Sequence, residues 1–102
     1  MRPWRLRVGP LVEGDLRSIE QYYREVAPEQ VTRFRRELRN TMAAVRNSPL
    51  LGREHAPGVR RRATRVFPYH AWYVVDDDAR TIIVTAVLHQ RRDPALAALR
   101  TR

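Results

Sequence analysis

The stretch YHAWYVVDDDARTIIVTAVLHQRRDP, residues 69–94, decides the fold. Two runs rich in aromatic and β-branched residues, 69–75 and 81–88, flank the acidic turn at 76–80, which is the pattern of two paired strands. The second run is apolar on both faces, as a central strand covered by helices should be. The polar segment HQRRDP, residues 89–94, follows it directly. We therefore expect a hairpin inside a sheet, with a charged segment at one end.

Two more runs predict strands. Residues 4–8 alternate apolar and charged side chains, which indicates a half-buried strand. Residues 59–67 are rich in arginine, and this favours the edge of the sheet, because charged side chains discourage the addition of further strands there. Proline and glycine mark residues 48–59 as a loop before that strand.

Two amphipathic helices separate the first strand from the others. Apolar residues recur every three or four positions in 11–26 and again in 29–47, so each helix has one apolar stripe. The short break at Ala27-Pro28 joins them as a helical hairpin whose stripes share one core. The stripes consist of Val12, Leu16, Ile19, Tyr23 and Val26, and of Val31, Phe34, Leu38, Met42 and Val45.

Residues 93–100 predict a short C-terminal helix, in which Asp93 is the N-cap and Pro94 the first helical residue. The predicted order is β-α-α-β-β-β followed by this helix. Because the strands are grouped after the helices, we expect an α+β fold with the helical hairpin packed on an antiparallel sheet. A chain of 102 residues fits a single domain, residues 1–102.

The composition excludes several classes of site. There is no cysteine, and hence no disulfide, thiolate metal site or cysteine nucleophile. The three aspartates at 76–78 suit a polar turn better than a metal site, so we expect neither a metal nor another cofactor. No apolar run approaches the roughly 18 residues of a membrane span. The N-terminus lacks a secretory signal, so we expect a cytoplasmic protein without a membrane partner.

The charge of the chain points to anionic partners. The net charge is +9, and all 20 basic residues are arginine. The excess is largest in residues 49–70, which hold five arginines and one acidic residue. A small domain this basic attracts polyanions such as nucleic acid or acidic protein segments.

Four stretches carry a resemblance to a known family: DLRSIEQYY (15–23), SPLLGR (48–53), GVRRRATRVFPYHAWYVV (58–75) and IIVTAVLHQRRDP (82–94). In this order and spacing the chain resembles the RelE/ParE superfamily of toxins from bacterial type II toxin–antitoxin modules. The resemblance covers nearly the whole sequence.

This resemblance implies one of two activities. RelE-like members cleave mRNA on the ribosome, whereas ParE-like members inhibit DNA gyrase and do not cut RNA. A cognate antitoxin, ParD-like in the second case, neutralises the toxin. The segments FPY (67–69) and HQRRDP (89–94) are closer to ParE-like sequences. We therefore expect a gyrase inhibitor that is not an enzyme and meets nucleic acid only through its antitoxin or its target.

The RNA-cleaving alternative requires a base, an acid and cations around one phosphate. RelE-like members supply these from the middle strands and the C-terminal region. If this chain is a nuclease, the catalytic candidates are Arg61, Arg65, His89 and Arg91. Several positions where the resemblance would place further groups hold other residues instead, namely Ala63, His70, Gln90 and Leu96. A third reading is a non-toxic member that acts only as a partner in an antitoxin complex.

For a binding toxin, the target-binding candidates are Arg60, Arg61, Arg62, Arg65, His89, Arg91 and Arg92. The antitoxin-binding candidates are Tyr22, Tyr23, Arg35, Arg39 and Trp72. Each set has a plainer alternative. Guanidinium groups bind carboxylates bidentately but also serve as solvated charges, and aromatic residues on a strand often pack in the core. The basic middle region could meet an acidic antitoxin tail or the target complex.

Overall fold

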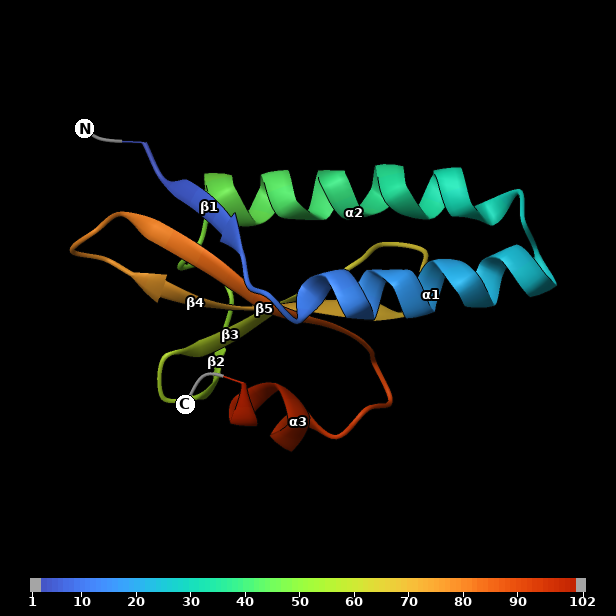
Figure 1. The fold of residues 1–102 in the computed structure, drawn as a ribbon. Coiled ribbons are helices and arrows are strands. Elements are labelled where there is room, and N and C mark those ends of the chain that lie inside the picture. Colours follow the sequence, from blue (N-terminus) through green and yellow to red (C-terminus); the bar gives the residue numbers. More distant parts are fainter. Residues whose placement is uncertain (1–2, 101–102) are drawn as a thin grey trace.

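The computed structural model describes residues 3–100, and its elements follow the predicted order (Figure 1). They are strand β1 (Arg5–Val8), helices α1 (Val12–Val26) and α2 (Gln30–Asn47), strands β2 (Glu54–Ala56), β3 (Val59–Ala63), β4 (Tyr69–Asp76) and β5 (Thr81–His89), and helix α3 (Pro94–Leu99). The helical hairpin and the short C-terminal helix are confirmed. The predicted loop between α2 and β3 contains the additional strand β2. None of the described helices combines the length and apolar character of a membrane span.

The five strands form one sheet in the order β1-β5-β4-β3-β2. β5 pairs antiparallel with β4 but parallel with β1, so the sheet is mixed rather than wholly antiparallel as we expected. The expectation failed at β1 because the direction of this short strand depends on how the helical hairpin returns the chain, and a local pattern does not contain that information. β3 is also not the edge strand, since β2 pairs with its first two residues.

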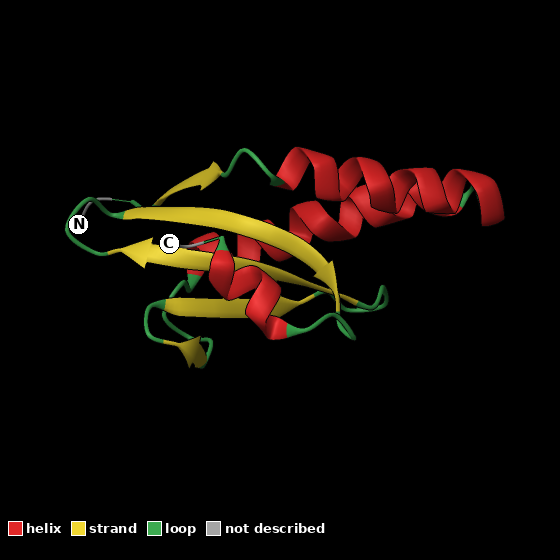
Figure 2. Ribbon diagram, turned by 60° about the horizontal axis from the view of Figure 1, so that its bottom comes forward, coloured by secondary structure: helices red, strands yellow, loops and turns green. Residues whose placement is uncertain are grey.

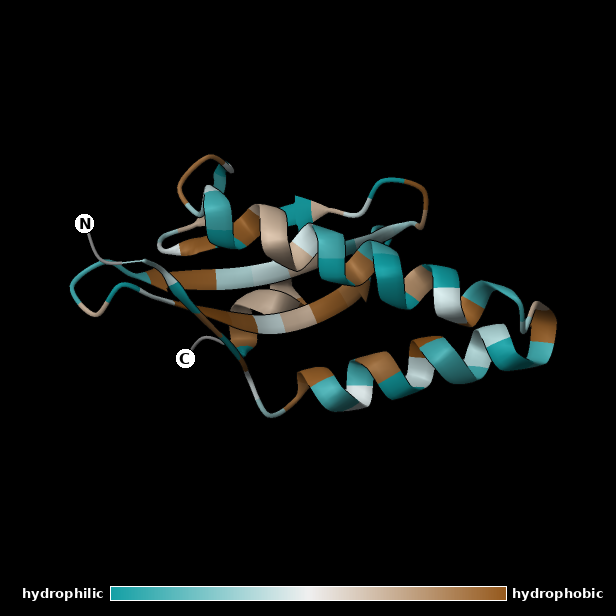
Figure 3. Ribbon diagram, turned by 90° about the horizontal axis from the view of Figure 1, so that it is seen from above, coloured by the Kyte–Doolittle hydropathy of each residue, from teal (hydrophilic) through white to brown (hydrophobic). Residues whose placement is uncertain are grey.

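The two helices of the hairpin lie on one face of the sheet, and α3 lies on the other (Figures 1 and 2). The main core lies under the hairpin, where both predicted stripes meet Tyr73, Ile82 and Val84. Figure 3 shows how apolar and polar residues alternate along both helices of the hairpin. Val26 is an exception to its stripe, with 58% of its surface exposed at the end of α1.

A second, smaller core lies on the opposite face of the sheet. Here Val59, Trp72, Ala86 and Leu88 pack together with Ala97 of α3. Because helices cover both faces, β5 is apolar on both sides, as its sequence predicted. α3 begins as expected, with the Asp93 carboxylate accepting a hydrogen bond from the Ala95 N–H.

Candidate functional site

The candidate residues lie in three separate places. The first is a groove of about 790 Å³ between α1 and the end of β5, which we call the α1–β5 groove. It brings Tyr22 and Tyr23 of α1 together with His89 and Arg92 of the HQRRDP segment. Tyr22 lies off the apolar stripe and is 55% exposed. Antitoxin-binding and target-binding candidates therefore share one surface.

The floor of the α1–β5 groove is aromatic. The Tyr69 hydroxyl donates a hydrogen bond to the Tyr23 hydroxyl at 3.5 Å, and burial raises the pKa of Tyr69 far above its ordinary value. The His89 ring meets Tyr69 edge-on, and His89 Nδ1 accepts the N–H of Arg91 at 3.1 Å. These contacts fix His89 at the end of its strand and leave the Arg91 and Arg92 side chains exposed.

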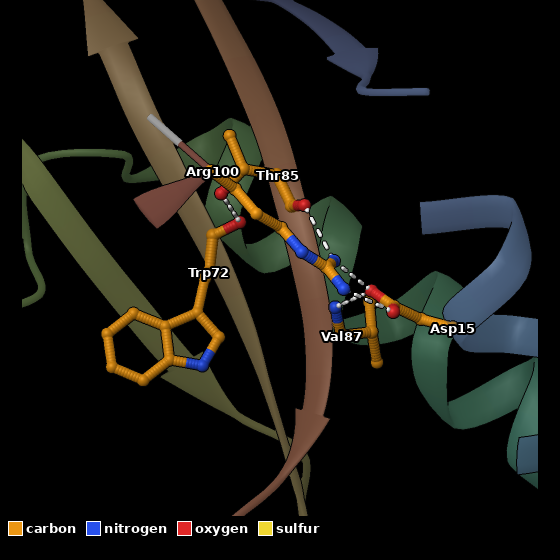
Figure 4. Close-up of polar contacts among 5 residues, drawn as sticks. All are labelled: Asp15, Trp72, Thr85, Val87 and Arg100. Carbon is orange, nitrogen blue, oxygen red and sulfur yellow. Dashed lines mark hydrogen bonds and ion pairs between the residues drawn. The ribbon is translucent and has the colours of Figure 1, made fainter. Parts of the chain in front are cut away.

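A carboxylate in the lining of this groove, that of Asp15, makes several polar contacts (Figure 4). Asp15 accepts two hydrogen bonds from the Arg100 guanidinium, at 2.6 and 2.9 Å, and a third from the backbone N–H of Val87 at 2.9 Å. Arg100 also donates to the Thr85 carbonyl at 3.2 Å, next to an irregularity in the β4–β5 register. The hydrogen bond that Arg100 donates to the Asp15 carboxylate raises the pKa of Arg100. α1, β5 and the end of α3 are thereby tied together.

Neither Asp15 nor Arg100 was among the residues that the sequence singled out. Asp15 resembles an ordinary acidic residue in the first turn of a helix, and Arg100 resembles one more surface arginine. The pair is 85 positions apart, and no local spacing connects two such residues.

The second place is a groove of about 520 Å³ between α2 and the turn that joins β3 to β4, which we call the α2 groove. It contains the target-binding candidates Arg62 and Arg65 and two further arginines, Arg33 and Arg36. Among the described residues that line it, Glu37 is the only acidic one, and its carboxylate accepts hydrogen bonds from the backbone of that turn.

The third place is the face of the sheet on the side of α3. The Arg61 guanidinium lies 5.2 Å from the centre of the Trp72 ring, and both His55 and His70 meet that ring edge-on. Burial, followed by the charge of Arg61, lowers the pKa of both imidazoles. We expected Trp72 to contact an antitoxin, but only 3% of its surface is exposed, which favours a role in packing.

Several of the remaining arginine candidates make contacts within the protein. Arg60 donates to the carbonyl of Gly52 and to Glu54, and Arg62 donates to the Ser48 carbonyl at 3.1 Å. Arg35 pairs with Glu20 and so joins α2 to α1. Arg39 is exposed on the surface of α2.

Residues 6–94 match the family model described as the ParE toxin of the type II toxin–antitoxin system parDE. No curated protein matches the chain. Solved structures share the fold at low sequence identity. The chromosomal ParDE system of P. aeruginosa is 18% identical with a TM-score of 0.73, over 84% of this chain and 95% of that one. The isolated RelE toxin of E. coli is 18% identical with a TM-score of 0.61, over 97% of each chain. The RelBE2 toxin–antitoxin complex of Mycobacterium tuberculosis is 18% identical with a TM-score of 0.56, over 86% of this chain and 99% of that one.

Proposed function

Because the chain belongs to the ParE toxin family of type II toxin–antitoxin systems, we propose that it is a cytoplasmic toxin that inhibits DNA gyrase and is neutralised by a cognate, ParD-like antitoxin. The observation that carries this proposal is the separation of the residues that an mRNA endonuclease would need. Arg61 lies against Trp72 on the α3 side of the sheet, whereas His89, with Arg91 next to it, lies in the α1–β5 groove on the side of the hairpin, and Arg65 lines the α2 groove.

This separation matters because acid–base catalysis requires all its groups within reach of one scissile phosphate. Arg61 pairs with Trp72 in the sheet and shares its face on the side of α3. His89 pairs with Tyr69, which faces the helical hairpin, so the sheet stands between Arg61 and His89. This arrangement supports a toxin that acts by binding.

The surface that we assign to the target is the rim of the α1–β5 groove formed by HQRRDP. Arg91 and Arg92 are exposed in the short connection between β5 and α3. Their position is fixed by the hydrogen bond from Arg91 N–H to His89 and by the bond from Arg92 N–H to the His89 carbonyl at 2.9 Å. Two guanidinium groups on a rigid turn are suited to bind carboxylates of a partner bidentately.

The proposal is tested in cells by pulse labelling after tightly controlled induction in a bacterial host. DNA synthesis is expected to fall before protein synthesis, together with a DNA-damage response. An earlier fall in protein synthesis, with mRNA cut on the ribosome, would instead identify a nuclease. Unchanged growth at a confirmed level of folded protein would identify a non-toxic member.

With purified components, a gyrase supercoiling assay tests the assigned surface. The double variant Arg91→Ala/Arg92→Ala is expected to inhibit gyrase about tenfold less well, because two charge-assisted contacts are lost. The matched control is Arg5→Ala/Arg7→Ala, which removes the same charge from exposed positions on β1. An equal loss in both variants would show that only the net charge matters and would exclude this rim as the contact.

A further inference from the structure

The α2 groove is held in shape before any partner arrives. Its outer wall is the turn between β3 and β4, and Glu37 of α2 binds this turn directly. The Glu37 carboxylate accepts the N–H of Val66 at 3.0 Å and that of Phe67 at 2.8 Å. The Thr64 hydroxyl adds a hydrogen bond to the Phe67 carbonyl within the turn. A partner would therefore meet a preformed surface, which lowers the entropic cost of binding.

The charges that line this groove are uncompensated. Arg33 and Arg36 stand three positions apart on α2 and so share a face of the helix, and Arg65 lies on the opposite wall. Within residues 3–100, none of these three guanidinium groups has a carboxylate partner. Glu37 is the one acidic residue among the described residues that line the groove, and its single negative charge leaves the four lining arginines in excess. The groove is therefore suited to an anionic ligand.

The same groove also offers apolar surface and exposed backbone. Val66 is 78% exposed, and the small side chain of Ala63 is exposed beside it. Within residues 3–100, β2 pairs only with the first two residues of β3, so no described strand pairs with the outer edge of β3 at Ala63. The Thr64 N–H donates a hydrogen bond to the Tyr69 carbonyl of β4. Because the backbone groups of alternate residues in a strand point to opposite sides, the N–H and carbonyl of Ala63 point outward, away from β4.

These features favour a peptide over a nucleic acid. Single-stranded nucleic acids usually stack their bases on open aromatic rings. Of the described residues that line the α2 groove, Phe67 is the one aromatic residue, and it is buried in the main core. An exposed valine and an open strand edge are instead suited to apolar side chains and a peptide backbone.

We propose that the α2 groove binds an acidic peptide segment in extended conformation. Its carboxylates pair with Arg33, Arg36 and Arg65, its apolar side chains cover Val66, and its backbone meets Ala63. The inference rests on the proposed function in one respect, because the antitoxin proposed there is the polypeptide that would carry such a segment.

The experiment is a fluorescence anisotropy titration of the full chain with a short, fluorescein-labelled peptide that alternates glutamate with leucine. Binding to the wild-type protein is expected to weaken as salt is added. Arg33→Ala/Arg36→Ala is expected to bind about tenfold more weakly, because two ion pairs are lost. The matched control is Arg5→Ala/Arg7→Ala, which removes the same charge from exposed positions on β1 outside the groove and is expected to bind like the wild type.

A second variant tests the apolar wall. Val66→Glu places a carboxylate at an exposed position and leaves the core intact, and it is expected to abolish binding of the peptide. Equal weakening in the two double-arginine variants would overturn the proposal. Tighter binding of a single-stranded oligonucleotide that displaces the peptide from the wild-type protein would also overturn it.

The peptide titration and the gyrase assay, both on the wild-type protein, test the two proposals separately. Gyrase inhibition without peptide binding would overturn this inference alone. Peptide binding with the expected dependence on Arg33 and Arg36, but without gyrase inhibition, would overturn the assigned target and leave the groove as a peptide site.

Discussion

At the scale of single residues, Asp15 connects three segments of the chain. Its carboxylate meets the Arg100 guanidinium and the Val87 N–H, and only 9% of the side chain is exposed. Removing one charge of such a pair leaves the other charge partly buried without its partner. The resulting loss of stability is larger than the loss from removing an exposed ion pair. The chain offers a comparison in the same helical turn, because Glu13 forms an ion pair with Arg17 that is exposed on both sides.

We expect Asp15→Asn to lower the free energy of unfolding by about 2 kcal/mol, since charge-assisted hydrogen bonds to Arg100 are weakened. Glu13→Gln makes the same chemical change in an exposed pair and is expected to cost less than about 0.5 kcal/mol. Urea unfolding followed by circular dichroism measures both. Similar costs for the two variants would mean that the Asp15–Arg100 pair contributes no more than a surface pair.

His70 gives a prediction about pH. Burial, followed by the charge of Arg61, lowers its pKa in the folded protein below the ordinary value of 6.5. As pH falls through 6.5, the unfolded chain therefore takes up a proton that the folded protein does not, and stability decreases. We expect the urea midpoint to fall over this range, and to fall less steeply in His70→Gln. Parallel curves for wild type and variant would contradict this role of His70.

At the scale of elements, Glu20 joins the two helices of the hairpin. Its carboxylate binds Arg35 of α2 as well as Arg24 of its own helix. The hydrogen bond with Arg35 holds the pKa of Glu20 below its ordinary value of 4.5. A carboxyl group whose folded pKa is lowered contributes stability above its unfolded pKa, and this contribution disappears as pH falls through the folded value.

Glu20→Gln is therefore expected to destabilise the protein at neutral pH and to unfold like the wild type in acid, below its lowered pKa. Urea titrations at the two pH values provide the measurement. A difference that persisted unchanged in acid would show that the substitution acts through packing rather than through charge.

The helix α3 covers part of the sheet. Ala97 is fully buried against the small core that contains Trp72. Removing residues 94–102 is expected to expose the Trp72 ring to water and shift its fluorescence to longer wavelength. The measurement requires a Trp4→Phe background, because Trp4 is the only other tryptophan. An unchanged emission maximum would show that α3 does not shield Trp72.

At the scale of the whole molecule, the dominant property is charge. The chain carries 20 arginines against 11 acidic residues, so the folded protein repels itself. We expect moderate salt, about 0.3 M, to raise the urea midpoint by screening this repulsion. Glucose at equal osmolarity is the control for stabilisation by a solute that is excluded from the protein surface without screening charge. A midpoint that fell with salt would mean that local ion pairs such as Asp15–Arg100 outweigh the long-range repulsion.

The sequence by itself determined the order of the elements, the apolar stripes of both helices, the position of β5 inside the sheet and the cap of α3 at Asp93. These features depend on local periodicity and on short capping patterns, which can be recognised from neighbouring residues alone. It also indicated the RelE/ParE superfamily, which the family model now shows.

Only the tertiary structure decided which residues meet. It placed β1 parallel to β5, brought Asp15 to Arg100, and put Arg61 and His89 on opposite faces of the sheet. It also assembled the α2 groove from a helix and a turn that are far apart in sequence. The physical reason is that pairing between distant segments depends on how whole layers pack. A charged residue looks the same in sequence whether its partner is solvent, a helix or the other end of the chain.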